Sequence, residues 1–121
     1  MHLISYFLSF IITITPNSFF KCDGDILNAK IINNENGDFS EVSDLKKIDN
    51  GAFVLLNWRV DLMLPRTFIA NEISFSDNKW KWIYENINQP RLLERLNSDK
   101  IKEYSCKSIE INSLEESKQN D

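Results

Sequence analysis

The sequence predicts a mainly β fold, a small antiparallel barrel or sandwich with one short helix near residues 90–97, behind an N-terminal signal segment. Apolar side chains recur at every second position over residues 52–64, and again over residues 72–84 on both sides of a turn signal. A period of two is that of β-strands. A third observation separates the leader from the domain, because no Lys, Arg, Asp or Glu occurs within residues 3–20.

The uncharged leader is typical of an export signal, because its apolar core is shorter than the roughly 20 residues that a membrane-spanning helix needs. We therefore expect residues 1–20 to be a signal peptide, or an uncleaved anchor that tethers the domain to a membrane. Phe19 and Phe20 stand where a peptidase prefers small residues. Two other interpretations are a lipid-modified Cys22 and a buried first strand or helix of a cytosolic domain.

The remainder of the chain has room for a single β-rich domain over residues 21–111, followed by a disordered tail over residues 112–121. The tail contains one large apolar residue and no aromatic residue. The formal net charge of the protein is -4, which disfavours nucleic acid as a partner.

Cys22 and Cys106 are the two cysteines of the chain and lie near opposite ends of the expected domain. In an oxidising compartment such a pair most simply forms one disulfide, which would stabilise the fold by about 4 to 5 kcal/mol through loop-closure entropy. The rival interpretations are two free thiols or a metal site. We expect no metal and no cofactor, because His2 is the single histidine and a typical zinc shell needs more nitrogen and sulfur ligands.

In the first part of the domain we expect one strand over residues 25–32. It ends at a polar loop over residues 33–38. Residues 39–48 fit either a short helix or an irregular strand.

The central run over residues 52–64 begins after the turn signal at Asn50 and Gly51 and is expected to stop at Pro65. Its first half has apolar residues at both parities and should be buried on both faces. Because the run is long for one strand, we expect it to bend or to split around residues 58–59.

The segment over residues 72–84 predicts a hairpin, with a two-residue turn at residues 77–78 that places Phe75 opposite Trp80. Residues 90–97 begin with a proline and carry leucines at helical spacing, which indicates the one short helix. Residues 101–111 alternate in polarity and suit one or two closing strands.

Catalytic chemistry has few candidate residues in this chain. With the single histidine in the leader, a cleaved product has no Ser-His-Asp or Cys-His arrangement. Asp61 and Glu72 are the best carboxylate pair for a small hydrolase, although Asp61 could equally form a surface ion pair with Arg59. We therefore assign no catalytic residue and expect the protein not to be an enzyme.

Candidate binding residues are two arginines and three tryptophans. Arg59 and Arg66 could hold an anion or a partner's carboxylate, or could be solvated turn residues. Trp58, Trp80 and Trp82 could line the pocket of a carrier for a small apolar ligand. The opposing interpretation is that the tryptophans belong to the core, because alternating Lys and Trp in a strand point to opposite faces.

Three segments resemble a family of small exported cyanobacterial proteins of unknown function: residues 49–58, 64–67 and 76–82, which read DNGAFVLLNW, LPRT and SDNKWKW. The resemblance covers the middle third of the chain. It implies an extracytoplasmic compartment, either periplasm or thylakoid lumen, and assigns no catalytic residue. Together with the leader and the cysteines, it predicts an exported, non-catalytic accessory or binding protein. Its partner would be a protein or a small apolar ligand.

Overall fold

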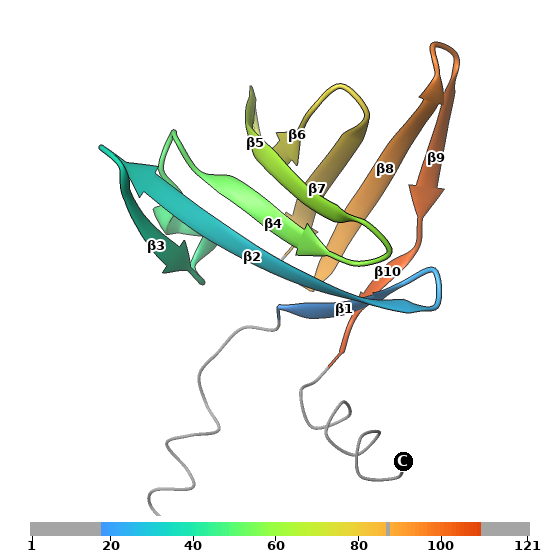
Figure 1. The fold of residues 1–121 in the computed structure, drawn as a ribbon, viewed down its shortest axis with the longest axis horizontal. Coiled ribbons are helices and arrows are strands. Elements are labelled where there is room, and N and C mark those ends of the chain that lie inside the picture. The colour runs from blue at the N-terminus through green and yellow to red at the C-terminus, as the bar shows by residue number, and fades with distance from the viewer. Residues whose placement is uncertain (1–17, 87, 110–121) are drawn as a thin grey trace, which may run out of the picture.

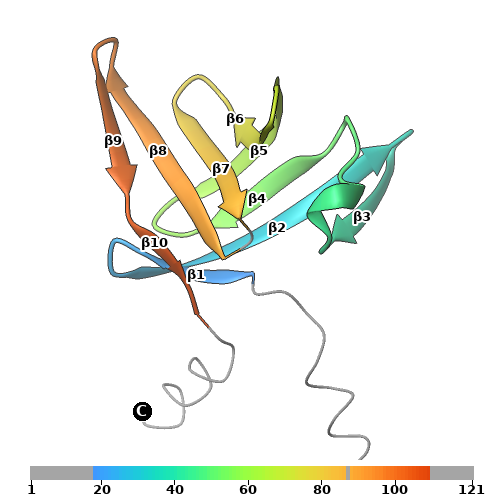
Figure 2. The same ribbon diagram turned by 180° about the vertical axis from the view of Figure 1, so that it is seen from behind.

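The computed structural model describes residues 18–86 and 88–109, which form a strongly curved antiparallel sheet (Figures 1 and 2). The expected tail and residues 1–17 of the expected signal segment lie outside the described residues. The elements are β1 (Phe19–Cys22), β2 (Asp25–Glu35), β3 (Asp38–Val42), the 3-10 helix η1 (Leu45–Lys47), β4 (Phe53–Asn57), β5 (Asp61–Ile69), β6 (Glu72–Ser76), β7 (Trp80–Asn86), β8 (Gln89–Asn97), β9 (Lys100–Tyr104) and β10 (Cys106–Ser108).

The sheet forms a nearly closed barrel, which is one of the two architectures, barrel or sandwich, that the sequence predicts. The hydrogen-bonded order runs β10-β1-β2-β4-β5-β6-β7-β8-β9, and β3 extends β2 outside this path. The two ends of the path, β9 and β10, are separated in the chain by Ser105 alone. The chain itself therefore joins both ends of the sheet, and β9 and β10 act as one strand that changes neighbours from β8 to β1.

The predicted disulfide is confirmed, and it lies at this closure. Cys22 and Cys106 are directly opposite in the β1–β10 ladder and are bonded to each other. The domain that we expected to begin at residue 21 includes β1 from Phe19, and Phe20 is 1% exposed in the core. The first folded residues thus precede the first cysteine by at least three positions.

Inward side chains from nearly every strand fill the barrel. Such filling is expected of small barrels, in which alternate residues of each strand meet around the axis. The largest fully buried side chains are those of Trp82, Phe20, Phe75, Leu27, Leu56, Leu64, Leu92 and Val54. Within the described ranges, no helix is long and apolar enough to cross a membrane.

The central run splits where the sequence predicts, with a turn over residues 58–60 between β4 and β5. Its expected end at Pro65 is wrong, because β5 continues to Ile69. The ladder with β4 ends at Pro65 and the ladder with β6 begins at Arg66. The proline, which has no N–H, therefore lies at the point where β5 changes its pairing partner from β4 to β6. Proline is tolerated at such a junction because it removes no ladder hydrogen bond.

The 72–84 hairpin forms, but the expected register is wrong by two residues. Phe75 pairs with Trp82 instead of Trp80. The Asp77 carboxylate accepts hydrogen bonds from the backbone N–H groups of Lys79 and Trp80, and the N–H of Asp77 donates to the carbonyl of Trp80. This side-chain bonding places the tight turn at residues 78–79.

The helix expected at residues 90–97 is wrong, because this segment is strand β8. Its leucines fit a helical spacing, yet Leu92 is buried whereas Leu96 is 52% exposed. β8 is paired with β7 on one side and with β9 on the other, and this long-range pairing overrides the weak helical pattern.

The first strand is longer than predicted, because β2 runs through half of the expected polar loop and turns at Asn36 and Gly37. Both residues have positive φ, 54° and 85°, as a tight hairpin requires. The ambiguous segment over residues 39–48 contains both expected structures, a strand (β3) and then a short helical turn capped by the side chain of Asp44. The closing segment forms two strands, β9 and β10.

Candidate binding surfaces

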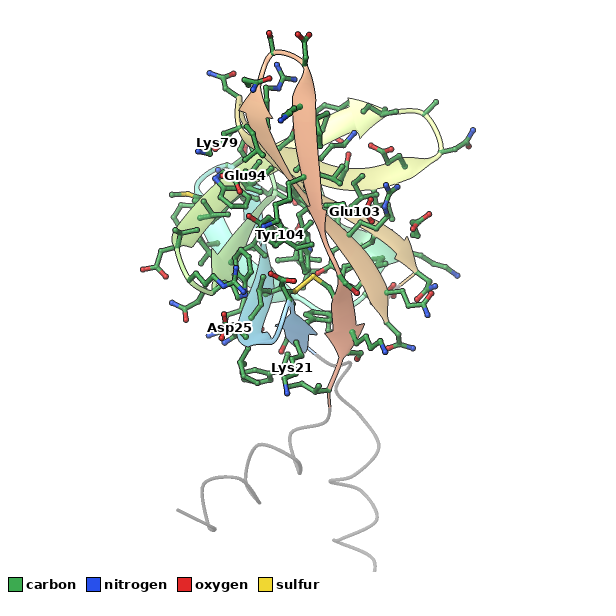
Figure 3. The ribbon with its side chains drawn as sticks, turned by 90° about the vertical axis from the view of Figure 1, so that its right-hand side faces the viewer. Lys21, Asp25, Lys79, Glu94, Glu103 and Tyr104 are labelled. Carbon is green, nitrogen blue, oxygen red and sulfur yellow. A yellow bond between two sulfur atoms is a disulfide. The ribbon has the colours of Figure 1, made fainter. Side chains whose placement is uncertain are left out.

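Three aromatic rings from distant strands form a cluster at one end of the barrel. The Trp58 ring lies edge-on to Tyr104, with ring centroids 4.9 Å apart, and edge-on to Trp80 at 6.3 Å. Trp80 and Tyr104 stack with an interplanar angle of 25°. Figure 3 shows Tyr104 central in this view, with Glu94 above it and Asp25 below. The structure therefore joins two of the three tryptophans that the sequence singled out.

Arg59 fixes this cluster to the β1–β2 turn. Its Nε donates to the Asp25 carboxylate at 2.6 Å, and its Nη2 donates to the backbone carbonyl of Asp23 at 2.8 Å. The guanidinium lies 4.5 Å above the Trp58 ring. The hydrogen bond to Asp25 raises the pKa of Arg59, with desolvation acting in the opposite direction. Asp61, the expected ion-pair partner, instead accepts a hydrogen bond from Asn57.

The Glu94 carboxylate is held on the other side of the cluster. The Tyr104 hydroxyl donates to it at 2.6 Å, and the Lys79 ammonium lies 3.2 Å away. The hydrogen bond from Tyr104 lowers the pKa of Glu94, and Lys79 adds to the effect. The same hydrogen bond raises the pKa of Tyr104.

This arrangement closes the end of the barrel. The rings lie against one another, Arg59 covers Trp58, and the Lys102 ammonium lies 4.5 Å from the Tyr104 ring centroid. The indole N–H of Trp58 donates to the carbonyl of Cys22 at 3.2 Å. The charged groups thus pack on the aromatic rings. The Trp58 hydrogen bond connects the β4–β5 turn to the backbone of the disulfide-bonded Cys22.

Trp82 and Arg66 lie apart from this cluster. Trp82 is 0% exposed in the core, edge-on to Phe20 at 5.5 Å. Arg66 is half-buried, and its Nη1 donates to the backbone carbonyls of Ile48 and Asp49 at 2.9 and 3.1 Å. Arg66 therefore fastens the loop between η1 and β4 to strand β5.

The candidate carboxylate pair is not brought together. Asp61 begins β5, whereas Glu72 pairs with Ile69 at the other end of that strand, about 26 Å away at the rise of an extended strand. A two-carboxylate hydrolase needs roughly 5 to 10 Å between its carboxyl groups. Glu72 is paired with Lys81 at 3.0 Å. Among residues 18–86 and 88–109, no group of His, Cys, Asp and Glu is suited to hold a metal ion.

An apolar surface outside the core lies on the outer face of β2 to β5. The ladders place Phe53 between Ile32 and Pro65 in one row, and Leu55 beside Met63 in the next. Phe39 of β3 lies edge-on to Phe53 at 6.0 Å. We call this surface the outer apolar patch; it consists of Ile32, Phe39, Phe53, Leu55, Met63 and Pro65.

Three large apolar members of the patch are exposed to solvent, whereas Ile32 and Phe53 are half-buried. Phe39 is 67% exposed, Met63 63% and Leu55 37%. The expectation that the first half of the central run is buried on both faces is therefore wrong for Leu55. A surface groove of about 360 Å³ between β2, β4 and β5 adjoins the patch, and Leu55 lines it. Sequence alternation fixes which parity faces outward, but it does not reveal that β3 adds Phe39.

The family described as a domain of unknown function (DUF8671) matches residues 30–106. The matched range contains all six members of the outer apolar patch as well as Cys106. The comparisons with curated proteins and with solved structures give no match.

Proposed function

The chain belongs to the DUF8671 family, which is described only as a domain of unknown function, and we propose that it is an exported, non-catalytic accessory protein that binds another protein through the outer apolar patch. The contiguous exposure of Phe39, Leu55 and Met63 carries this proposal. Soluble proteins rarely leave several large apolar side chains together in water, and such patches mark interaction sites.

The filled interior favours a partner on the outside over a small ligand on the inside. A carrier needs a cavity lined by apolar side chains. In this barrel the central positions are occupied by Trp82, Phe75 and Leu92, each 0% exposed. Trp58 and Trp80 pack on Tyr104 and on each other, which argues for a structural role.

Export is supported by three independent observations. The segment over residues 3–20 has no charged residue, the Cys22–Cys106 bond is compatible with an oxidising compartment, and the resemblance to exported cyanobacterial proteins points to the periplasm or the thylakoid lumen. Intact mass of the protein from its native host tests export: loss of the leader, with thiols labelled only after reduction, is expected. A full-length mass with two free thiols would contradict it.

Partner binding is tested by photo-crosslinking from single positions in the native host. A photoreactive amino acid replaces Met63 in the patch, and in a matched control it replaces Lys107, which is exposed on β10. We expect a discrete protein adduct from position 63 and none from position 107. Equal labelling from both positions, or none from position 63, would overturn the proposal.

A further inference from the structure

The strand β3 has an edge that is free for pairing. Within the described residues it pairs with β2 alone. In a two-residue hairpin the residues that flank the turn form a hydrogen-bonded pair, so Asp38 and Ser40 direct their backbone groups toward β2. The backbone groups of Phe39 and Glu41 consequently point away from the sheet. This edge is acidic, and neither Asp38 nor Glu41 has a Lys or Arg within ion-pair distance in the described part of the chain.

The strand β9 has a free edge of the opposite charge. Its ladder partner is β8, and the N–H of Arg95 donates to Lys79 on the β7 side of β8. Hydrogen bonding alternates along a strand, so the backbone of Ile101, which opposes Arg95, points away from β8. Lys100 and Lys102 flank Ile101, and the Ile101 side chain is 64% exposed.

We infer that β3 of one copy pairs with β9 of a second copy, so that the protein assembles head to tail by joining sheet edges. The acidic edge and the basic edge complement each other in charge, and each carries one exposed apolar residue, Phe39 and Ile101. The β8–β9 hairpin projects from the barrel on the side away from β3 (Figure 1). The two edges lie on opposite sides of one molecule, so they can pair only between two copies.

One antiparallel register aligns an outward-pointing backbone residue of each edge, although it leaves Glu41 opposite the turn residue Asp99 and outside the paired segment. Phe39 opposite Ile101 of the second copy aligns the two outward-pointing backbones and brings two apolar side chains together. The neighbouring pair then joins Asp38 to Lys102. Since Phe39 and Ile101 both lie on the outer faces of their sheets, the joined sheets continue without a change of face. The contact is short, and an interface of this size is expected to be weak.

The test uses two charge reversals that each place like charges at the proposed contact, Asp38→Lys and Lys102→Glu, with Lys107→Glu on β10 as the matched control. Sedimentation velocity from about 10 µM to about 1 mM, a range suited to weak interfaces, measures association. We expect the wild-type protein and Lys107→Glu to sediment faster as concentration rises. Each reversal alone should weaken association by about tenfold or more, because it places like charges opposite each other.

The decisive sample is an equimolar mixture of the two reversal variants. Both contacts between unlike variants are charge-complementary, because the unchanged Asp38 of one faces the unchanged Lys102 of the other and the two reversed positions also face each other, so association in the mixture should recover to about the wild-type level. A monomeric wild type, or a mixture that associates no more strongly than either variant alone, would overturn the inference. Thermal unfolding of each variant verifies that it is folded. Crosslinking from Met63 tests the proposed partner separately, because these reversals leave the outer apolar patch intact.

Discussion

Cys22 and Cys106 face each other across the β1–β10 ladder, and their bond joins the first strand of the barrel to the last. The sequence separation of 84 residues means that the bond closes nearly the whole domain into one loop. Reduction, or Cys106→Ser, is expected to lower the free energy of unfolding by about 4.5 kcal/mol, the loop-closure entropy of a loop of that length. Urea unfolding with and without reductant measures it. A loss below about 1 kcal/mol would show that the bond contributes little to stability.

Arg66 is expected to stabilise the fold rather than bind a ligand. Arg66→Met removes the donor to the carbonyls of Ile48 and Asp49 and leaves these acceptors without it. The free energy of unfolding should fall by about 2 kcal/mol, the cost of losing charge-assisted hydrogen bonds at a half-buried site. Arg95→Met, at an exposed position, is the control and should change stability by less than about 0.5 kcal/mol. Equal effects of the two substitutions would contradict the anchoring role.

Alkaline pH should destabilise the protein through Tyr84. Burial raises the pKa of Tyr84 to about 12, against an ordinary value of 10.0. The folded state therefore holds this proton more tightly than the unfolded chain, and the resulting stability is complete below pH 10 and is lost between about pH 10 and 12. Unfolding experiments across this range should show a decline that is smaller in Tyr84→Phe. An identical decline in the variant would assign the effect to another group.

Acid should weaken the contact between Glu94 and Tyr104. The hydrogen bond from Tyr104 lowers the pKa of Glu94 below its ordinary value of 4.5, so this stability is present above that pH and is lost as the pH falls through the lowered pKa. Tyr104→Phe should cost about 1 to 2 kcal/mol near neutral pH, because it removes a hydrogen bond to a charged group. At pH 3 and below, the difference from the wild type should shrink. A difference that is independent of pH would contradict this assignment.

Local patterns predict most of the strands and the faces of many core residues, but long-range pairing decides the rest. Alternation over residues 52–64 correctly placed Val54, Leu56 and Leu64 in the core. The spacing of the leucines in residues 90–97 fits both a helix and a strand. Pairing with both β7 and β9 makes this segment a strand. The hairpin register depended on the side chain of Asp77, which a count of turn residues does not include.

The candidate surfaces could be predicted only in part, because they too depend on long-range pairing. Trp58 and Trp80 are visible in the sequence, but their contact with Tyr104 requires β9 to return beside the β4–β5 turn after some 45 intervening residues. The outer apolar patch likewise depends on β3, whose pairing with β2 brings Phe39 beside Phe53. Contacts between distant segments follow from barrel closure, and no local pattern encodes them.

The yield of the crosslinked adduct from position 63, compared between the wild-type background and Phe39→Ser, tests the proposed partner binding most directly. Phe39 is 67% exposed, so its replacement should leave the fold intact while removing an apolar contact surface. The account predicts a discrete adduct that falls by about tenfold in the Phe39→Ser background, the loss expected when a large apolar contact is removed. An adduct of unchanged yield, or no adduct in either background, would contradict it.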